Sequence, residues 1–311
     1  MNVTIVNEKK TDAFLNLVQS KFRNSLQVNI VSPSELLVQL GDTVVLIPEH
    51  TSVDVYLIEK APMLKLVQCG AGYDYVDLEA AAERGIFVAN ASGVNKVAVA
   101  EHTFALILSL AKKIVLLDRS MKEGGWQSKI DVALEIRGKT LGVVGLGNIG
   151  VEVAKIGLAF GMRVLAFKKH PVIYEGLDVK LVGLERLLGE SDIISVNLTL
   201  NDLTYHIIRE REFEMMKESV LLVNTSRGAV VDEEALYDAL YTHRIAGAGL
   251  DVFSLEPLPQ DSPFRKLENV ILTPHSAAST REALESRYLF FAENALRILR
   301  GLRPINVVNQ L

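Results

Sequence analysis

Short runs of β-branched and apolar residues alternate with stretches of helical periodicity along most of the chain. In the first third, this pattern predicts strands at residues 3–6, 28–31, 44–47, 64–68 and 86–89. Helices are expected between them, at residues 12–22, 33–40, 53–60 and 77–84. Because parallel strands need a crossover connection, usually a helix, this alternation predicts a parallel sheet with helices on both faces.

A long apolar stretch interrupts this rhythm. Residues 97–122 are predicted to form one long helix that ends at Gly124 and Gly125, since glycine is typical of helix ends. Six further strands are expected at residues 140–144, 163–167, 192–197, 220–224, 246–250 and 270–272, and a last helix at 280–300. The chain is therefore predicted to be an α/β protein with two doubly wound parallel-sheet domains.

Length, charge and cysteine content restrict the class of protein. The 311 residues suit two domains, and the net charge of −5 argues against a nucleic acid or an anionic membrane surface as the main partner. Glu101 and Lys112 interrupt the 97–122 stretch, so we do not expect it to cross a membrane. The single cysteine, Cys69, follows an apolar run and is expected to be buried. Without a partner for a disulfide or a signal-peptide pattern, the chain is predicted to be cytoplasmic.

A glycine-rich turn is the strongest local motif. It reads Gly145-Leu146-Gly147-Asn148-Ile149-Gly150, directly after the strand expected at 140–144 and before a helix expected at 151–160. Glycines allow a tight turn and close approach of a pyrophosphate, which the positive end of the next helix then faces. In this context the turn predicts a dinucleotide site, with an ordinary strand-turn-helix connection as the alternative.

The residues after the next strand bear on the choice of cofactor. An NAD site usually places Asp or Glu there to bind the ribose hydroxyls. This chain has Lys168, Lys169 and then His170, whose positive charge suits the 2′-phosphate of NADP. NADP is therefore preferred to NAD, although two lysines after a strand are also common on a solvated surface.

Several motifs, in one order along nearly the whole chain, resemble those of the D-isomer-specific 2-hydroxyacid dehydrogenases. That family includes glyoxylate and hydroxypyruvate reductases and phosphoglycerate dehydrogenases. Besides the glycine turn, the motifs are Gly70-Ala71-Gly72-Tyr73-Asp74, Gly93-Val94-Asn95, Val99-Ala100-Glu101-His102-Thr103, Asn224-Thr225-Ser226-Arg227-Gly228, Gly249-Leu250-Asp251-Val252-Phe253, Glu256-Pro257 and Thr273-Pro274-His275-Ser276.

The resemblance implies the roles of the two domains. Residues 1–93 with 280–311 would form a flavodoxin-like substrate domain, and residues 94–279 a Rossmann cofactor domain. In relatives the region of the long helix forms a dimer interface, so a homodimer is expected.

Three residues are implied to be catalytic: Arg227, Glu256 and His275. Arg227 offers a planar, permanently charged fork for the carboxylate and carbonyl of a 2-keto acid. His275 would give a proton to the developing alkoxide and take it back in the oxidative direction. Glu256 would orient the His275 ring, since a neighbouring carboxylate favours the imidazolium. Without the resemblance, each would pass for a surface or turn residue.

Further contacts follow from the same resemblance. Substrate is expected to meet Ala71 and Gly72 of the loop, Asn95 and Arg227. The cofactor is expected to meet Leu198, Thr225, Asp251 and Thr103, besides the turn residues Gly145, Gly147, Asn148, Ile149 and Gly150 and the lysines Lys168 and Lys169. His102 and Glu101 are interpreted as structural, and no residue is assigned to a metal.

Two positions depart from the family's pattern. Asn197 stands where members often have a proline, so the family's shape for the wall at Leu198 is not carried over to this chain. Gln68 occupies a region where phosphoglycerate-using relatives commonly carry arginine, which weakens the case for a phosphorylated substrate.

The leading hypothesis is reduction of a small unphosphorylated 2-keto acid, such as glyoxylate or hydroxypyruvate, with NADPH. The first alternative is an NAD-linked phosphoglycerate or general D-2-hydroxyacid dehydrogenase. The second is a dinucleotide-binding corepressor that acts through protein contacts.

Overall fold

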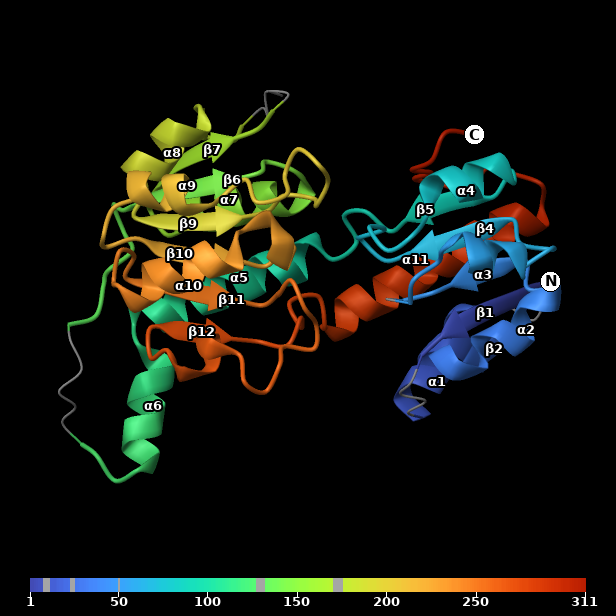
Figure 1. The fold of residues 1–311 in the computed structure, drawn as a ribbon, viewed down its shortest axis with the longest axis horizontal. Coiled ribbons are helices and arrows are strands. Elements are labelled where there is room, and N and C mark those ends of the chain that lie inside the picture. The colour runs from blue at the N-terminus through green and yellow to red at the C-terminus, as the bar shows by residue number, and fades with distance from the viewer. Residues whose placement is uncertain (8–11, 23–25, 50, 127–131, 170–175) are drawn as a thin grey trace. The chain divides into compact units, whose positions relative to one another are not determined.

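The computed structural model describes residues 1–7, 12–22, 26–49, 51–126, 132–169 and 176–311 (Figure 1). The chain divides into two compact units, Met1–Asn95 with Thr280–Leu311, and Lys96–Ser279. Each unit holds one sheet of parallel strands, which confirms the predicted α/β class with two parallel sheets.

The first unit contains a five-stranded sheet in the order β2-β1-β3-β4-β5. Its strands are β1 (Asn2–Val6), β2 (Gln27–Val31), β3 (Val45–Ile47), β4 (Leu66–Cys69) and β5 (Phe87–Asn90). Its helices are α1 (Asp12–Lys21), α2 (Leu36–Gln39), α3 (Val55–Glu59), α4 (Leu78–Glu83) and α11 (Arg281–Leu299). This strand order is the flavodoxin-like one, and all five predicted strands are confirmed.

Alternation along the strands of the first unit divides its core between two faces. Val3 and Ile5 pack with Phe291 of α11, whereas Val6 packs with Leu57 and Ile58 of α3. Both sets are buried, so helices cover both sides of the sheet, as the near-continuous apolar strands predict. Cys69 is fully buried as expected, and burial raises the pKa of its thiol to about 12.

The second unit contains a seven-stranded sheet in the order β12-β11-β10-β9-β6-β7-β8. Its strands are β6 (Thr140–Val144), β7 (Arg163–Phe167), β8 (Lys180–Leu181), β9 (Ile193–Val196), β10 (Leu221–Asn224), β11 (Gly247–Leu250) and β12 (Val270–Leu272). Its helices are α5 (Lys96–Ala111), α6 (Ile114–Lys122), α7 (Asn148–Ala159), α8 (Leu184–Glu190), α9 (Glu210–Met215) and α10 (Glu233–Tyr241). The order doubles back at β6, where the two halves of a doubly wound sheet meet. The sequence missed β8, because two residues carry no periodicity.

The prediction of one continuous helix over residues 97–122 is wrong, because the stretch is divided into two helices. Two helices, α5 and α6, occupy this stretch, and between them Lys113 adopts a left-handed backbone with φ of 55°. α5 buries Phe104 and Ile107 against its own unit, whereas α6 has no buried residue. The chain turns at Lys113 because α5 follows the core and α6 leaves it, and apolar content does not distinguish the two situations.

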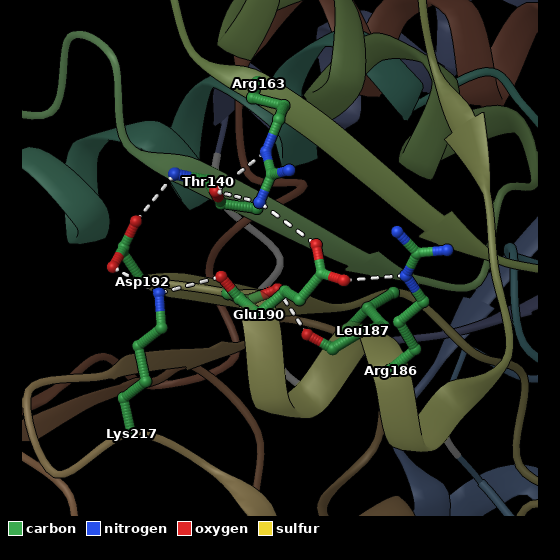
Figure 2. Close-up of polar contacts among 8 residues, drawn as sticks. Thr140, Arg163, Arg186, Leu187, Glu190, Asp192 and Lys217 are labelled. Atoms are coloured by element: carbon green, nitrogen blue, oxygen red, sulfur yellow. Dashed lines mark hydrogen bonds and ion pairs between the residues drawn. The ribbon is translucent and has the colours of Figure 1, made fainter.

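Polar contacts fasten the amino ends of the strands in the second unit (Figure 2). Nζ of Lys217 lies 2.8 Å from Oδ1 of Asp192, and Oδ2 of Asp192 accepts the backbone N–H of Thr140 at 2.8 Å. Arg163 donates to the hydroxyl of Thr140 and pairs with Glu190 at 3.1 Å. This network joins the first residues of β6 and β7 to the segments that enter β9 and β10.

Among the described residues, no helix is both long and apolar enough to cross a membrane.

Candidate active site

Most of the predicted site residues of the second unit follow the carboxyl ends of neighbouring parallel strands. Because these strands all end at one edge of the sheet, loops far apart in sequence meet there. The positions are Gly145 after β6, Lys168 after β7, Leu198 after β9, Arg227 after β10, Asp251 after β11 and His275 after β12.

Two of the three glycines in the turn are required by their surroundings. Gly145 has φ of +101°, and a Cβ there would lie 2.6 Å from the carbonyl oxygen of Asn197. A Cβ on Gly150 would lie 2.1 Å from the carbonyl oxygen of Gly145. A Cβ on Gly147 would meet nothing within 4 Å, although this residue caps α7. Only the middle glycine therefore faces open space.

That open space lies at the beginning of α7. The cap residue Gly147 brings no side chain to the first turn, whose leading residues, Asn148 and Ile149, are exposed and half-buried. A helix start with backbone N–H groups and a positive dipole end suits a phosphate group. The residues present thus fit the pyrophosphate of a dinucleotide.

Leu198 lies against the turn and half-buried in the core of the unit. A Cβ on Gly145 would come within 2.9 Å of Cδ2 of Leu198. The neighbouring Asn197 donates its backbone N–H to the carbonyl of Val144 at 2.8 Å, and its side-chain amide to Ser195. Proline has no N–H to make the first of these bonds, so asparagine at this position continues the pairing with β6.

The two lysines follow β7 directly. The backbone N–H of Gly145 donates to the carbonyl of Phe167 at 3.0 Å, so Lys168 begins next to the glycine turn. Lys168 is half-buried and Lys169 is exposed. No Asp or Glu stands beside them at the end of β7. His170 lies outside the described residues.

His275 and Glu256 form a close pair. Nδ1 of His275 lies 2.7 Å from Oε2 of Glu256, while Oε1 accepts the backbone N–H of Phe253 at 2.9 Å. Burial of the Glu256 carboxyl opposes its ionisation. The hydrogen bonds from His275 and Phe253 and the charges of His275 and Arg227 outweigh that effect, so the pKa of Glu256 lies below its usual value. Glu256 is therefore ionised at neutral pH.

Arg227 reaches the same place through a tight approach of two loops. It precedes the short 3-10 turn Gly228–Val230, and a Cβ on Gly228 would lie only 2.0 Å from the carbonyl carbon of Phe253. The backbone after β10 thus packs directly on the backbone that leads to Glu256. Asn224 shapes the Arg227 loop, since its amide donates to the Arg227 carbonyl at 2.9 Å and its Oδ1 accepts from Ser226. The structure therefore brings Arg227, Glu256 and His275 together.

Thr103 lies behind Thr225. Both are buried, and Thr103 is fully so. The hydroxyl of Thr103 donates to the carbonyl of Val99 at 2.8 Å, so at 2.9 Å it accepts the hydroxyl proton of Thr225. A hydrogen bond from Thr225 to Thr103 of α5 thus fixes the side chain of Thr225.

Asp251 is fully buried and organises the loop that carries His275. Its Oδ1 accepts from the Thr273 hydroxyl at 2.6 Å and from the Ser276 N–H at 2.9 Å, and its Oδ2 accepts from the Ala277 N–H at 2.9 Å. His102 of α5 joins this group, although it lies 171 positions before Thr273. The sequence placed Thr273 in a motif and His102 among the structural residues but did not predict their contact, because no local pattern signals a contact over that separation.

The remaining predicted residues belong to the first unit. Ala71 and Gly72 lie in the loop after β4, and the amide of Asn90 donates to the carbonyl of Ala71 at 2.8 Å. Asn95 is the last residue of the first unit before the chain continues into the second unit at Lys96. Its Oδ1 is buried and has no hydrogen-bond partner within the part of the chain that the structure describes.

Gln68 does not lie at a surface where substrate could reach it. Its side chain is fully buried, donates to the carbonyl of Cys69 at 2.9 Å and accepts from Asn294 of α11 at 2.7 Å. The prediction that the lack of arginine in this region weakens the case for a phosphorylated substrate stays a prediction, since the burial of Gln68 does not test it.

The chain is similar to known proteins over most of its length. A family model described as "D-isomer specific 2-hydroxyacid dehydrogenase, NAD binding domain" matches residues 104–277. The chain is 43% identical over 265 residues to a glyoxylate reductase from Korarchaeum cryptofilum, a match that covers 83% of this chain and 80% of the relative. It is 42% identical over 296 residues to a D-3-phosphoglycerate dehydrogenase from Archaeoglobus fulgidus, which covers 92% of this chain and 56% of the relative. The chain thus spans little more than half the length of that dehydrogenase.

Among solved structures, an acyclic imino acid reductase in complex with NADPH and D-Arg superimposes with a TM-score of 0.88. It is 33% identical in sequence, over 99% of this chain and 100% of that one.

Proposed function

Because the chain belongs to the family of D-isomer specific 2-hydroxyacid dehydrogenases, we propose that it transfers a hydride between a nicotinamide cofactor and a small 2-keto or 2-hydroxy acid. Glyoxylate and hydroxypyruvate are the proposed substrate types. The observation that carries the proposal is the 2.7 Å contact of His275 with Glu256, within reach of the charge of Arg227. These are the groups that a carbonyl reduction needs at one place.

His275 is the proposed acid and base. Glu256 occupies Nδ1 of the ring, so Nε2 is the nitrogen through which His275 would protonate the carbonyl oxygen during reduction. In the oxidative direction the same nitrogen would take the hydroxyl proton. The ionised Glu256 orients the ring and compensates its positive charge.

Arg227 is proposed to bind the substrate. A 2-keto acid carries a carboxylate and a carbonyl oxygen side by side, and a guanidinium presents two N–H groups at matching separation. Ala71 and Gly72 are proposed to bind the substrate carboxylate through backbone N–H groups, with Asn95 as a further contact.

The second unit is proposed to hold the dinucleotide, which supplies or accepts the hydride when bound. Gly145, Gly147 and Gly150, with Asn148 and Ile149, would hold the pyrophosphate, and Leu198 would form a wall beside it. Thr225 and Asp251 are proposed to lie beside the nicotinamide, with Thr103 supporting Thr225.

NADP is proposed as the preferred cofactor over NAD. The support is the pair Lys168 and Lys169 at the end of β7, where an NAD site usually carries an acid.

A second candidate function is that of a D-3-phosphoglycerate dehydrogenase. It is favoured by the 42% identity to such an enzyme over 92% of this chain. The two functions differ in the group at the far end of the substrate, which is a phosphate in one and absent or a hydroxyl in the other.

We also propose that the protein is a cytoplasmic homodimer. α6 exposes Ile114, Val115 and Met121 by 50–52% of their surfaces and buries none of its residues within the chain. A second copy would cover such an apolar face. Elution at the monomer mass at micromolar concentration would argue against the dimer.

The test is a set of initial rates with NADPH and NADH on glyoxylate, hydroxypyruvate, pyruvate and 3-phosphohydroxypyruvate. His275→Asn is the inactivating variant, and His243→Asn is its matched control. Both histidines have positive φ, 49° and 56°, which asparagine tolerates, and His243 is exposed on the surface. Turnover that survives in His243→Asn and is lost in His275→Asn supports the proposal. Equal rates in both variants would exclude His275 as the acid and base.

A further inference from the structure

A chain of hydrogen bonds lies behind the loop that carries His275. Nε2 of His102 lies 3.1 Å from Oγ1 of Thr273 and 3.5 Å from Oδ1 of Asp251. Oγ1 of Thr273 in turn lies 2.6 Å from Oδ1 of Asp251. The side chain of Asp251 is fully buried and that of His102 is 23% exposed, so these contacts are largely shielded from water. Shielding makes such polar contacts stronger and more directional.

The direction of each hydrogen bond follows from the number of protons available. A threonine hydroxyl has one proton, and Oδ1 of Asp251 accepts it together with the N–H of Ser276. Thr273 therefore donates to Asp251 and must accept from His102, which requires the proton on Nε2 of His102. His102 thus acts as a donor that sets the orientation of the Thr273 hydroxyl.

The same aspartate holds the backbone around His275. The N–H of His275 donates to the carbonyl of Asp251 at 2.8 Å and to that of Thr273 at 3.1 Å. The N–H groups of Ser276 and Ala277 donate to its two carboxylate oxygens. His275 itself has φ of 49°, a conformation that is uncommon for residues other than glycine. The hydrogen bonds of this segment to Asp251 and Thr273 hold His275 in that conformation.

We propose that His102 is a positioning residue for His275, an inference that rests on the proposed function of His275. His102 reaches the loop from α5, a helix that packs on β10 and β11 of the same unit. By donating to Thr273 it keeps Thr273 and Asp251 in the one arrangement that directs the His275 ring at Glu256. A shift of this loop by a fraction of an ångström would lengthen the 2.7 Å contact between His275 and Glu256. It would also move the proton-donating ring of His275 away from its position for catalysis.

The experiment compares two substitutions of His102 that differ in hydrogen bonding. His102→Phe keeps a planar ring of similar size and removes the donor, whereas His102→Gln keeps an N–H near the position of Nε2. We expect kcat to fall about tenfold in His102→Phe and to stay within about threefold of wild type in His102→Gln, by analogy with other groups that orient reacting residues. The Kd of NADPH, from fluorescence titration, and the KM of the acid should change by less than about threefold in both variants. Thr273→Val should reproduce the loss, and adding His102→Phe to it should cause no further loss.

A second readout does not depend on activity. The ring resonances of His275, identified by their absence in His275→Asn, should shift in His102→Phe and return in His102→Gln. Wild-type kcat and unshifted resonances in His102→Phe would overturn the proposal, as would an equal loss in the Phe and Gln variants. If His275→Asn keeps full turnover, the proposed role of His275 fails, and the resonance shifts alone then decide whether His102 orders the loop.

Discussion

The ring of His275 and the carboxylate of Glu256 lie 2.7 Å apart although 19 positions separate them in sequence. Glu256 follows β11 and His275 follows β12, and these strands are parallel neighbours. The backbone N–H of Phe253 holds the other oxygen of the carboxylate at 2.9 Å. Glu256 thus stays in place whether or not the ring changes its protonation state.

Replacing Glu256 by glutamine tests the charge in this pair. Glu256→Gln keeps the size of the side chain and removes the compensation of the imidazolium, so kcat/KM should fall about 10²-fold, the scale of general acid–base effects. Glu233→Gln is the matched control, since the Glu233 carboxylate also accepts a backbone N–H, from Ser254. Loss of activity in both variants would mean that the loop, rather than the charge, had been disturbed.

The pH dependence of the wild type follows from the pKa of Glu256. Because that pKa lies below the ordinary value of 4.5, the ionised form persists as the pH falls and is lost only through the lower, folded-state pKa. In a profile of kcat/KM, protonation of Glu256 should therefore lower the rate by no more than about a tenth above about pH 5.5, one unit above the ordinary pKa. A loss of activity above that pH that disappears in Glu256→Gln would contradict this prediction.

The glycine turn separates the requirements for folding from those for binding. Gly147→Ala places its Cβ in open space, so the free energy of unfolding should change by less than about 1 kcal/mol while the Kd of the dinucleotide rises at least about tenfold. Gly150→Ala would place a Cβ 2.1 Å from a carbonyl oxygen and should destabilise the unit. Gly183→Ala is the matched control, since Gly183 caps α8 and a Cβ there also meets nothing within 4 Å. Unchanged dinucleotide affinity in Gly147→Ala would place the cofactor elsewhere.

The cofactor preference should depend on the charge after β7. Lys168→Asp combined with Lys169→Ala replaces positive charge with the acid typical of NAD sites, so the ratio of kcat/KM for NADPH to that for NADH should fall by at least about tenfold. Lys266→Ala, an exposed lysine of the same unit, is the control. A wild type that already prefers NADH would overturn the cofactor proposal without changing the proposed reaction.

The pair of Asp192 and Lys217 (Figure 2) should make stability depend on pH in the acid range. Partial burial opposes ionisation of Asp192, but the hydrogen bonds from Lys217 and the Thr140 N–H prevail, so its pKa lies below the ordinary 3.8. The stabilisation is present above that value and is lost as the pH falls through the folded pKa. Asp192→Asn should lower the free energy of unfolding by about 1 kcal/mol at pH 7 and by less at pH 3, measured by urea titration. Asp261→Asn, at an exposed position, should show no such difference.

Much of the architecture follows from local pattern. Apart from β8, the strands of both sheets lie within two residues of the predicted ranges, because strands covered on both faces are continuous apolar runs bounded by polar turns. The glycine turn was equally visible, since the conformations and close approaches at Gly145 and Gly150 exclude side chains. These features depend on residues that are adjacent in sequence, so the sequence alone is enough to predict them.

Other features depend on which loops meet in space. The break at Lys113 arises because α5 follows the core and α6 does not, a difference in surroundings rather than in composition. The burial of Gln68 and its bond to Asn294 require the return of α11 to the first sheet. The hydrogen bond of His102 to Thr273 spans 171 positions and exists because α5 packs across the strands that carry Thr273 and Asp251. Contacts of this kind come from the packing of whole elements, which no short stretch of sequence encodes.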